Sequence, residues 1–261
     1  MPVLLVLCAG VPTAWGQDEL GKLLERLADG PSDESILYSL EGQPEDQRTL
    51  PALKAKFEGA TEKRERQAIA STLLRLGERS GEYFDFLAGY VKDAIADQSP
   101  LFVKHDASGK GIRGEFSNEF LNWCALNDKD PRAVAARQFG VYPEDVHFLA
   151  RAGDPRARDL LRGGLESQNP LIVGYSVEGL GRLHDVEAIP LIAKAAERLP
   201  AGDRLVVAMN LPWYSRPEAF QLMTQIAPDA RTREFLTRQV QGLQMAELQN
   251  SLRRQGKNPG K

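Results

Sequence analysis

Residues 154–227 carry three columns of residues that recur at a spacing of 31 positions. The first column holds a small residue, and the other two hold large apolar residues. The columns are Ala157, Ala188 and Ala219; Leu160, Leu191 and Leu222; and Leu161, Ile192 and Met223. A small residue lets a neighbouring helix approach, and we expect the apolar pair after it to fill the groove. Because a single helical hairpin cannot bury its apolar stripe alone, the repeat predicts an all-α chain folded as an α-solenoid of stacked hairpins.

The rest of the chain shows the same helical pattern. Apolar residues recur at spacings of three and four, which is typical of amphipathic helices. Asp130, Asp154 and Asn169 each precede a proline. This pairs a capping side chain with a residue that tolerates the first helical position, so each pair predicts the start of a helix. No run of alternating β-branched residues competes with this interpretation.

One repeat unit carries a resemblance to a known family. The residues 185–192, Asp-Val-Glu-Ala-Ile-Pro-Leu-Ile, resemble the first helix of a HEAT repeat of the bacterial, bilin-lyase-like type. Residues 50–53 repeat its apolar-Pro-x-apolar core, and residues 74–77 and 180–185 resemble endings of its second helix. The resemblance is good over about 154–227 and fair over about 46–96. It implies HEAT-like helical hairpin repeats and says little about function.

We expect five segments along the chain. They are a signal peptide at 1–16; N-terminal helices and HEAT-like repeats at 17–98; an inserted glycine-rich loop at 99–116; HEAT-like repeats with a long C-terminal capping helix at 117–255; and a disordered tail at 256–261.

The first sixteen residues lack charged side chains and include the apolar run 3–9. Small residues at Ala14 and Gly16 suit signal cleavage before Gln17, although no Lys or Arg precedes the apolar run. The pattern predicts a periplasmic or secreted protein whose mature chain has no transmembrane helix; the alternative is a cytoplasmic protein. Cleavage would remove Cys8 and leave Cys124, which we expect to be a buried, uncatalytic thiol among apolar neighbours.

Residues 109–114 spell Gly-Lys-Gly-Ile-Arg-Gly, which matches a dinucleotide-binding pattern. That site needs a strand directly before the glycines and a helix opening within them. Here residues 104–108 separate a possible strand from the glycines, and we expect no second strand. The segment therefore predicts a flexible loop. Two alternatives remain: binding of an anion such as phosphate through Lys104, Lys110 and Arg113, or a loop that orders on contact with a partner.

Two other groups are candidates for a functional surface. Trp213 and Tyr214 follow a Leu-Pro pair and form either an interface hot spot or a packed repeat junction. Five arginines lie among acidic residues, and we expect them to form a solvated face of mixed charge. They are Arg151, Arg156, Arg158, Arg162 and Arg182.

Charge and composition narrow the function further. Lys and Arg number 33 against 36 Asp and Glu, so a nucleic-acid partner is not expected. The chain has three histidines and two cysteines, and we expect no metal, cofactor or catalytic residues. The leading hypothesis is an exported, non-enzymatic HEAT-repeat scaffold that binds another protein or a peptide. The alternatives are a bilin-lyase-like enzyme or accessory, which the resemblance implies, and a small-ligand or anion binder using the 99–116 loop.

Overall fold

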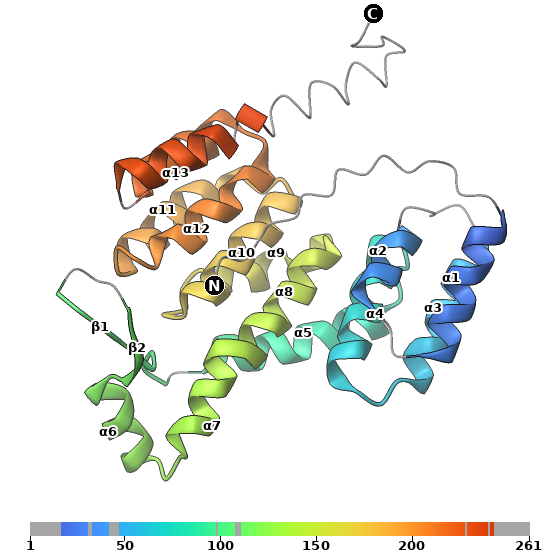
Figure 1. The fold of residues 1–261 in the computed structure, drawn as a ribbon, viewed down its shortest axis with the longest axis horizontal. Helices are drawn as coiled ribbons and strands as arrows, with labels where there is room; N and C mark the ends of the chain where they lie inside the picture. The colour runs from blue at the N-terminus through green and yellow to red at the C-terminus, as the bar shows by residue number, and fades with distance from the viewer. Residues whose placement is uncertain are drawn as a thin grey trace, which may run out of the picture. The chain divides into compact units, whose positions relative to one another are not determined.

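The computed structural model describes residues 17–30, 33–41, 47–97, 99–107, 111–227, 229–239 and 241–242, and these residues are mostly helical (Figure 1). The predicted signal peptide at 1–16, the tail at 256–261 and the predicted final helix beyond 242 lie outside the described residues. The chain divides into two compact units, Met1–Arg79 and Ser80–Lys261.

The described residues of the N-terminal unit form four helices, in the region where the sequence predicts N-terminal helices. They are α1 (Gln17–Asp29), α2 (Glu34–Glu41), α3 (Thr49–Gly59) and α4 (Lys63–Arg75). Helix α1 packs on α2 and α3, and both of these pack on α4. The core between them is mostly aliphatic and includes the ring of Phe57, because apolar residues at helical spacing turn one face of each helix inward. Its fully buried members include Leu27, Leu37, Leu53 and Ile69.

The second unit is organised around four helices that contact one another in chain order. They are α5 (Gly81–Ala96), α8 (Tyr142–Ala152), α10 (Pro170–Arg182) and α12 (Arg204–Asn210). Three further helices alternate with them: α9 (Arg158–Gly164), α11 (Ile189–Arg198) and α13 (Pro217–Ile226) (Figure 1). Helix α9 packs on α10, and α11 and α13 pack on each other and on α12.

Short 3-10 turns join several of these helices. They are η2 (Pro155–Ala157), η3 (Val186–Ala188) and η4 (Leu211–Tyr214). As the sequence predicts, Asp154 and Asn169 accept hydrogen bonds from Arg156 N and Leu171 N, which lie two residues further on. These caps satisfy amide groups that have no partner inside the helix.

The 31-residue columns differ in burial. All three alanines of the first column are 0% exposed, and Leu161, Ile192 and Met223 of the third column are at most 1% exposed. The middle column is mixed: Leu160 is half-buried, Leu191 is 37% exposed and Leu222 is 7% exposed. The expectation that both apolar residues fill the groove is therefore wrong for Leu191, because two adjacent residues on a helix point about 100° apart.

The inserted segment is not the flexible loop without a second strand that the sequence predicts. β1 (Val103–His105) and β2 (Gly111–Phe116) form an antiparallel pair, with an irregular register between Val103 opposite Phe116 and His105 opposite Gly111. An isolated pair of strands is marginal in water. Here aromatic side chains support it: the Phe116 ring lies 6.3 Å from that of Phe102.

Three short elements lie between β2 and α8 in the second unit. They are α6 (Asn118–Leu126), α7 (Pro131–Ala136) and the π-helical turn η1 (Arg137–Val141), which leads directly into α8. Phe120 and Cys124 of α6 and Ala135 of α7 form a small buried cluster, against which Phe102 and Phe116 of the strand segment pack. The aromatic residues thus hold the β-hairpin against α6.

Candidate functional site

Of the three predicted anion-binding residues, Lys104 has a described side chain. Lys104 lies on β1, and its Nζ is 2.7 Å from Glu115 Oε2 on β2, so a carboxylate already offsets its charge. Lys110 and the side chain of Arg113 lie outside the described residues. Gly111 has a structural explanation, because a Cβ at this position would come within 2.9 Å of Val103 Cγ1. These contacts favour a strand pairing over a phosphate cradle.

Trp213 and Tyr214 have different surroundings, although they are adjacent in η4. Tyr214 is 1% exposed, and its hydroxyl has no hydrogen-bond partner among the described residues. Burial raises the pKa of this phenol above its ordinary value. Tyr214 is thus a core residue, which favours the packed junction over the interface hot spot for this side chain. Trp213 is only half-buried, and a Cβ on Gly181 would come within 2.7 Å of its Cβ.

Trp213 is held in place by α10. The guanidinium carbon of Arg182 lies 3.7 Å from the centroid of the Trp213 ring, which is a close cation–π contact. Arg182 also donates to Glu178 Oε1, from Nε at 2.9 Å and with Nη2 at 2.8 Å. Because Glu178 is 5% exposed, this ion pair anchors the arginine, and the arginine fixes the indole.

The buried carboxylate of Glu178 also lies close to a residue of α8. His147 Nδ1 lies 3.6 Å from Glu178 Oε2, and the His147 ring lies 4.8 Å from the ring of Tyr175. His147, Tyr175 and Trp213 are each half-buried. We call His147, Tyr175, Arg182 and Trp213 the aromatic stripe; it crosses α8, α10 and η4, with Glu178 beneath it. Sequence reasoning found only its Trp213 end.

Charge favours the ionised form of Glu178. Burial by itself would raise the pKa of this carboxyl. The imidazole of His147 and the guanidinium of Arg182 outweigh that effect and hold the pKa of Glu178 below its ordinary value of 4.5. The carboxylate therefore remains charged at neutral pH, so the Glu178–Arg182 pair that positions Trp213 is intact there.

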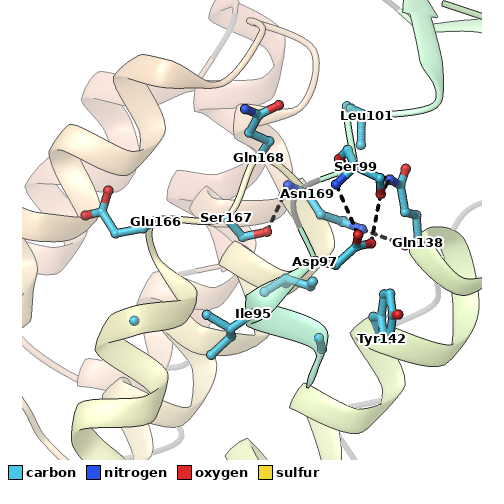
Figure 2. Close-up of a pocket in the computed structure, with 13 residues that line it drawn as sticks. Ile95, Asp97, Ser99, Leu101, Gln138, Tyr142, Glu166, Ser167, Gln168 and Asn169 are labelled. Carbon is cyan, nitrogen blue, oxygen red and sulfur yellow. Dashed lines mark hydrogen bonds between the residues drawn. The ribbon is translucent and has the colours of Figure 1, made fainter. Parts of the chain in front are cut away.

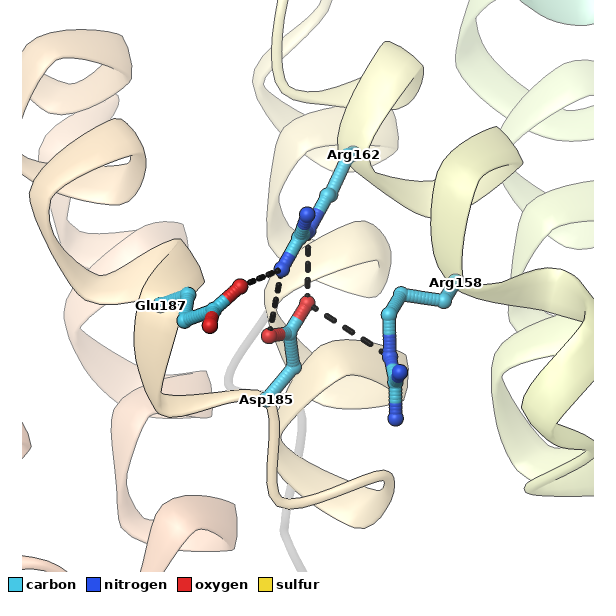
Figure 3. A network of polar contacts seen from close by, with 4 residues as sticks. All are labelled: Arg158, Arg162, Asp185 and Glu187. Carbon is cyan, nitrogen blue, oxygen red and sulfur yellow. Dashed lines mark hydrogen bonds and ion pairs between the residues drawn. The ribbon is translucent and has the colours of Figure 1, made fainter.

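The other arginines also pair with buried carboxylates. Arg162 donates two hydrogen bonds of 2.7 Å to the carboxylate of Asp185, from Nε and from Nη2 (Figure 3). Its Nη2 also lies 3.1 Å from Glu187 Oε2. Arg158 Nε is 3.9 Å from Asp185 Oδ2. Asp185 is only 5% exposed, so this network joins α9 to the start of η3.

A second network surrounds Asp154, which lies 31 residues before Asp185. Asp154, 2% exposed, accepts from Arg156 Nε at 3.0 Å and Nη2 at 2.8 Å, and the Arg156 guanidinium carbon lies 4.4 Å from the centroid of the Phe84 ring. Arg151 is itself 1% exposed. The predicted solvated face of mixed charge is therefore wrong for the buried Arg151, whereas Arg156 and Arg158 pair with buried acids and keep side chains that are 39% and 47% exposed.

A cavity of about 250 Å³ lies between the carboxyl end of α5, η1 and the turn between α9 and α10 (Figure 2). Gln138 of η1 builds one wall. Its side chain is buried, and its Nε2 donates to Ser99 Oγ at 2.5 Å and to Pro100 O at 3.0 Å. Its Oε1 accepts from Phe102 N at 3.0 Å. A π-helical turn such as η1 is often found at functional sites.

Two further side chains, Asp97 and Asn169, contribute hydrogen bonds to the polar wall. Asp97 follows α5 and points its carboxylate toward Ser99 (Figure 2), accepting from Ser99 N at 3.0 Å and from Ser99 Oγ at 2.9 Å. Asn169, 8% exposed, donates from Nδ2 to Gln138 O at 2.6 Å. The residues come from segments far apart in the sequence, so no local pattern predicts this cavity.

The surroundings of the remaining candidate residues indicate structural rather than chemical roles. Cys124 is fully buried, as expected, and burial together with the charge of Asp130 raises the pKa of its thiol. His184 adopts a left-handed backbone conformation in the turn after α10. Within the described ranges, no group of three or more His, Cys, Asp or Glu side chains is placed to hold a metal ion. None of the helices described is both long and apolar enough to cross a membrane.

The sequence matches no protein-family model and no curated protein.

Proposed function

We propose that this chain is an exported, non-catalytic HEAT-like α-solenoid that binds a protein or peptide partner across its aromatic stripe. Two features support the solenoid. The helices α5, α8, α10 and α12 contact one another in chain order, and the alanine column with a 31-residue spacing is buried throughout. Export rests on the apolar, uncharged residues 1–16. Stacked helical hairpins commonly use an extended surface to bind partners.

The half-exposed Trp213 is the observation that carries the proposal. Tryptophan, tyrosine and arginine are enriched among the residues that contribute most to binding at protein interfaces. Here Arg182 and Glu178 fix the indole before any partner arrives. A side chain that is already ordered loses less conformational entropy on binding, which strengthens the complex.

The shape of the stripe indicates an extended partner. His147 lies on α8, Tyr175 and Arg182 lie on α10, and Trp213 follows α12, so the exposed parts of these side chains follow successive helices. A peptide that runs across the helices would contact each in turn. Its apolar side chains would pack on the rings.

The proposal is tested by affinity capture from the envelope fraction of the source cells, followed by quantitative mass spectrometry. The baits are the wild-type chain, Trp213→Ala, Tyr175→Ala and a control, Phe139→Ala. Phe139 is 71% exposed on η1 and outside the stripe, so its removal matches the loss of a surface aromatic. We expect one dominant partner with wild type and control. Each stripe variant should recover at least about tenfold less, since loss of a hot spot costs 2 kcal/mol or more.

Circular dichroism establishes that each bait is folded. Equal recovery of the partner by all four folded baits would refute the role of the stripe. Recovery of background proteins only, by the wild-type chain at physiological salt, would refute the binding function itself.

A further inference from the structure

We propose that the cavity between α5, η1 and α10 binds a primary ammonium group on a short alkyl chain, with Asp97 as its counter-ion. The aromatic stripe shares no side chain with this site, so refuting one of the two proposals would not refute the other. Three observations support it: the hydrogen-bonding capacity left in the wall, the charge of the lining, and the apolar surface beside it.

The part of the polar wall formed by Gln138, Ser99 and Asp97 has spare capacity to accept hydrogen bonds rather than to donate them. Both N–H groups of the Gln138 amide are used, on Ser99 Oγ and Pro100 O. The Ser99 hydroxyl donates to Asp97 Oδ2. Each oxygen of Asp97 accepts one bond from Ser99, whereas a carboxylate has room for about four. An ammonium group fits this balance, because it donates three hydrogen bonds and accepts none.

The charge of the lining also favours a cation. Among the described residues that line the cavity there is no lysine or arginine, and there are two carboxylates, Asp97 and Glu166. Glu166 lies 3.4 Å from Arg198 Nη2 and is largely solvent-exposed, which leaves Asp97 as the unbalanced charge. Asp97 also follows the carboxyl end of α5, where the helix dipole is negative.

The positive end of the helix dipole, at the amino end of α10, disfavours a cation in the cavity only weakly. Pro170, its first residue, has no N–H, and the N–H of Leu171 already donates to the capping side chain of Asn169. An anion would therefore find few free donors there. This contrasts with the sequence-based alternative of an anion site in the 99–116 segment.

The size and the apolar part of the lining define the rest of the ligand. Ala94, Ile95, Leu101 and Ile172 contribute aliphatic surface. About 250 Å³ is smaller than the cavities that hold drug-sized ligands. A chain of four or five methylene groups ending in an ammonium pairs an apolar stem with a charged head. Both a free alkylamine and a lysine side chain have this chemistry.

The test is NMR titration of the isotope-labelled full-length chain with n-butylammonium. The side-chain NH2 signals of Gln138, Asn169 and Gln168 report directly on the cavity wall. We expect these signals to shift with a Kd on the order of 1 mM. Butyrate and 1-butanol, which match the alkyl chain without the positive charge, should bind at least about tenfold more weakly.

The matched variants are Asp97→Asn and Asp93→Asn, which make the same charge change. Asp93 is exposed on α5 and does not line the cavity. Asp97→Asn should weaken butylammonium binding at least about tenfold, and Asp93→Asn should leave it unchanged. Equal binding of butylammonium and butanol by the wild-type chain would overturn the proposal, even if Asp97→Asn fails to fold. So would equal affinities in the two folded variants, or no shift of the cavity signals.

Two further titrants separate the sources of the ammonium group. They are 1,5-diaminopentane and a tripeptide, Gly-Lys-Gly, blocked at both ends. If both shift the cavity signals, the site admits a lysine side chain of a polypeptide. If only the diamine does, the ligand is a free amine; either result supports the site.

Discussion

The packing of α10 predicts a large difference between two glycine-to-alanine substitutions. Gly179 lies in α10, and a Cβ there would lie 2.9 Å from both Ala150 Cα and Ala150 Cβ and 2.7 Å from Leu161 Cδ1. Carbon atoms normally pack about 3.5–4.0 Å apart. The Gly179→Ala variant must therefore move α8 away from α10 by roughly 0.6 Å, because no change of rotamer relieves a clash with backbone.

Gly89 provides the matched control. It lies inside α5, is exposed, and would bring a new Cβ within 4 Å of no other atom. Alanine stabilises a helix interior by about 1 kcal/mol relative to glycine, and this gain is common to both variants. Overpacking costs about 1–3 kcal/mol. We therefore expect Gly179→Ala to be less stable than Gly89→Ala by about 1–3 kcal/mol.

Urea unfolding followed by circular dichroism measures this difference. The slope of the free energy against urea concentration must be equal for the two variants if the midpoints are to be compared. A difference in the free energy of unfolding below about 0.5 kcal/mol would refute the close approach of α8 and α10.

Two further predictions concern buried polar groups. Because the pKa of Glu178 is lower in the folded than in the unfolded chain, its ion pairs contribute stability that is complete above the ordinary value of 4.5 and lost as the pH falls through the folded value. The stability of wild type relative to Glu178→Gln, measured by urea unfolding, should thus shrink from about pH 6 to about pH 3, and a constant difference would contradict this. Tyr214→Phe removes a buried hydroxyl without a hydrogen-bond partner among the described residues, so it should raise the free energy of unfolding by up to about 1 kcal/mol; a loss of that size would show that the hydroxyl is hydrogen-bonded.

Local patterns were sufficient to predict the helices but not the β-hairpin. Apolar spacing and caps such as Asp154 and Asn169 act within a few residues, so the sequence displays them directly. Strand β2 contains two glycines and two charged residues, a composition that does not favour a strand. It is stabilised by the contact between Phe116 and Phe102 and by Phe120 of α6. Such tertiary contacts have no local signature.

Part of the arginine networks could have been predicted from the 31-residue spacing. Asp154 and Asp185 stand 31 residues apart, in step with the three columns, and both are buried. An acid that recurs in register at a buried position needs a cationic partner. The interleaved arginines supply it, but burial of the acids was required to distinguish an anchoring pair from a solvated one. The cavity had no comparable signal, because its lining combines residues of several distant segments.

The glycines of α10 connect its packing to the proposed binding surface. Each glycine inside a helix costs about 1 kcal/mol relative to alanine, so such residues usually have a packing reason. In α10, a Cβ added at Gly174 would come too close to Val206, one at Gly179 to Ala150, and one at Gly181 to Trp213. At Gly181 the absent side chain lets η4 approach closely, and this approach places the Trp213 ring over Arg182. The glycine at 181 therefore lowers the local stability of the helix and at the same time sets the position of the half-exposed indole. A side chain at 181 should displace that ring as well as strain the fold.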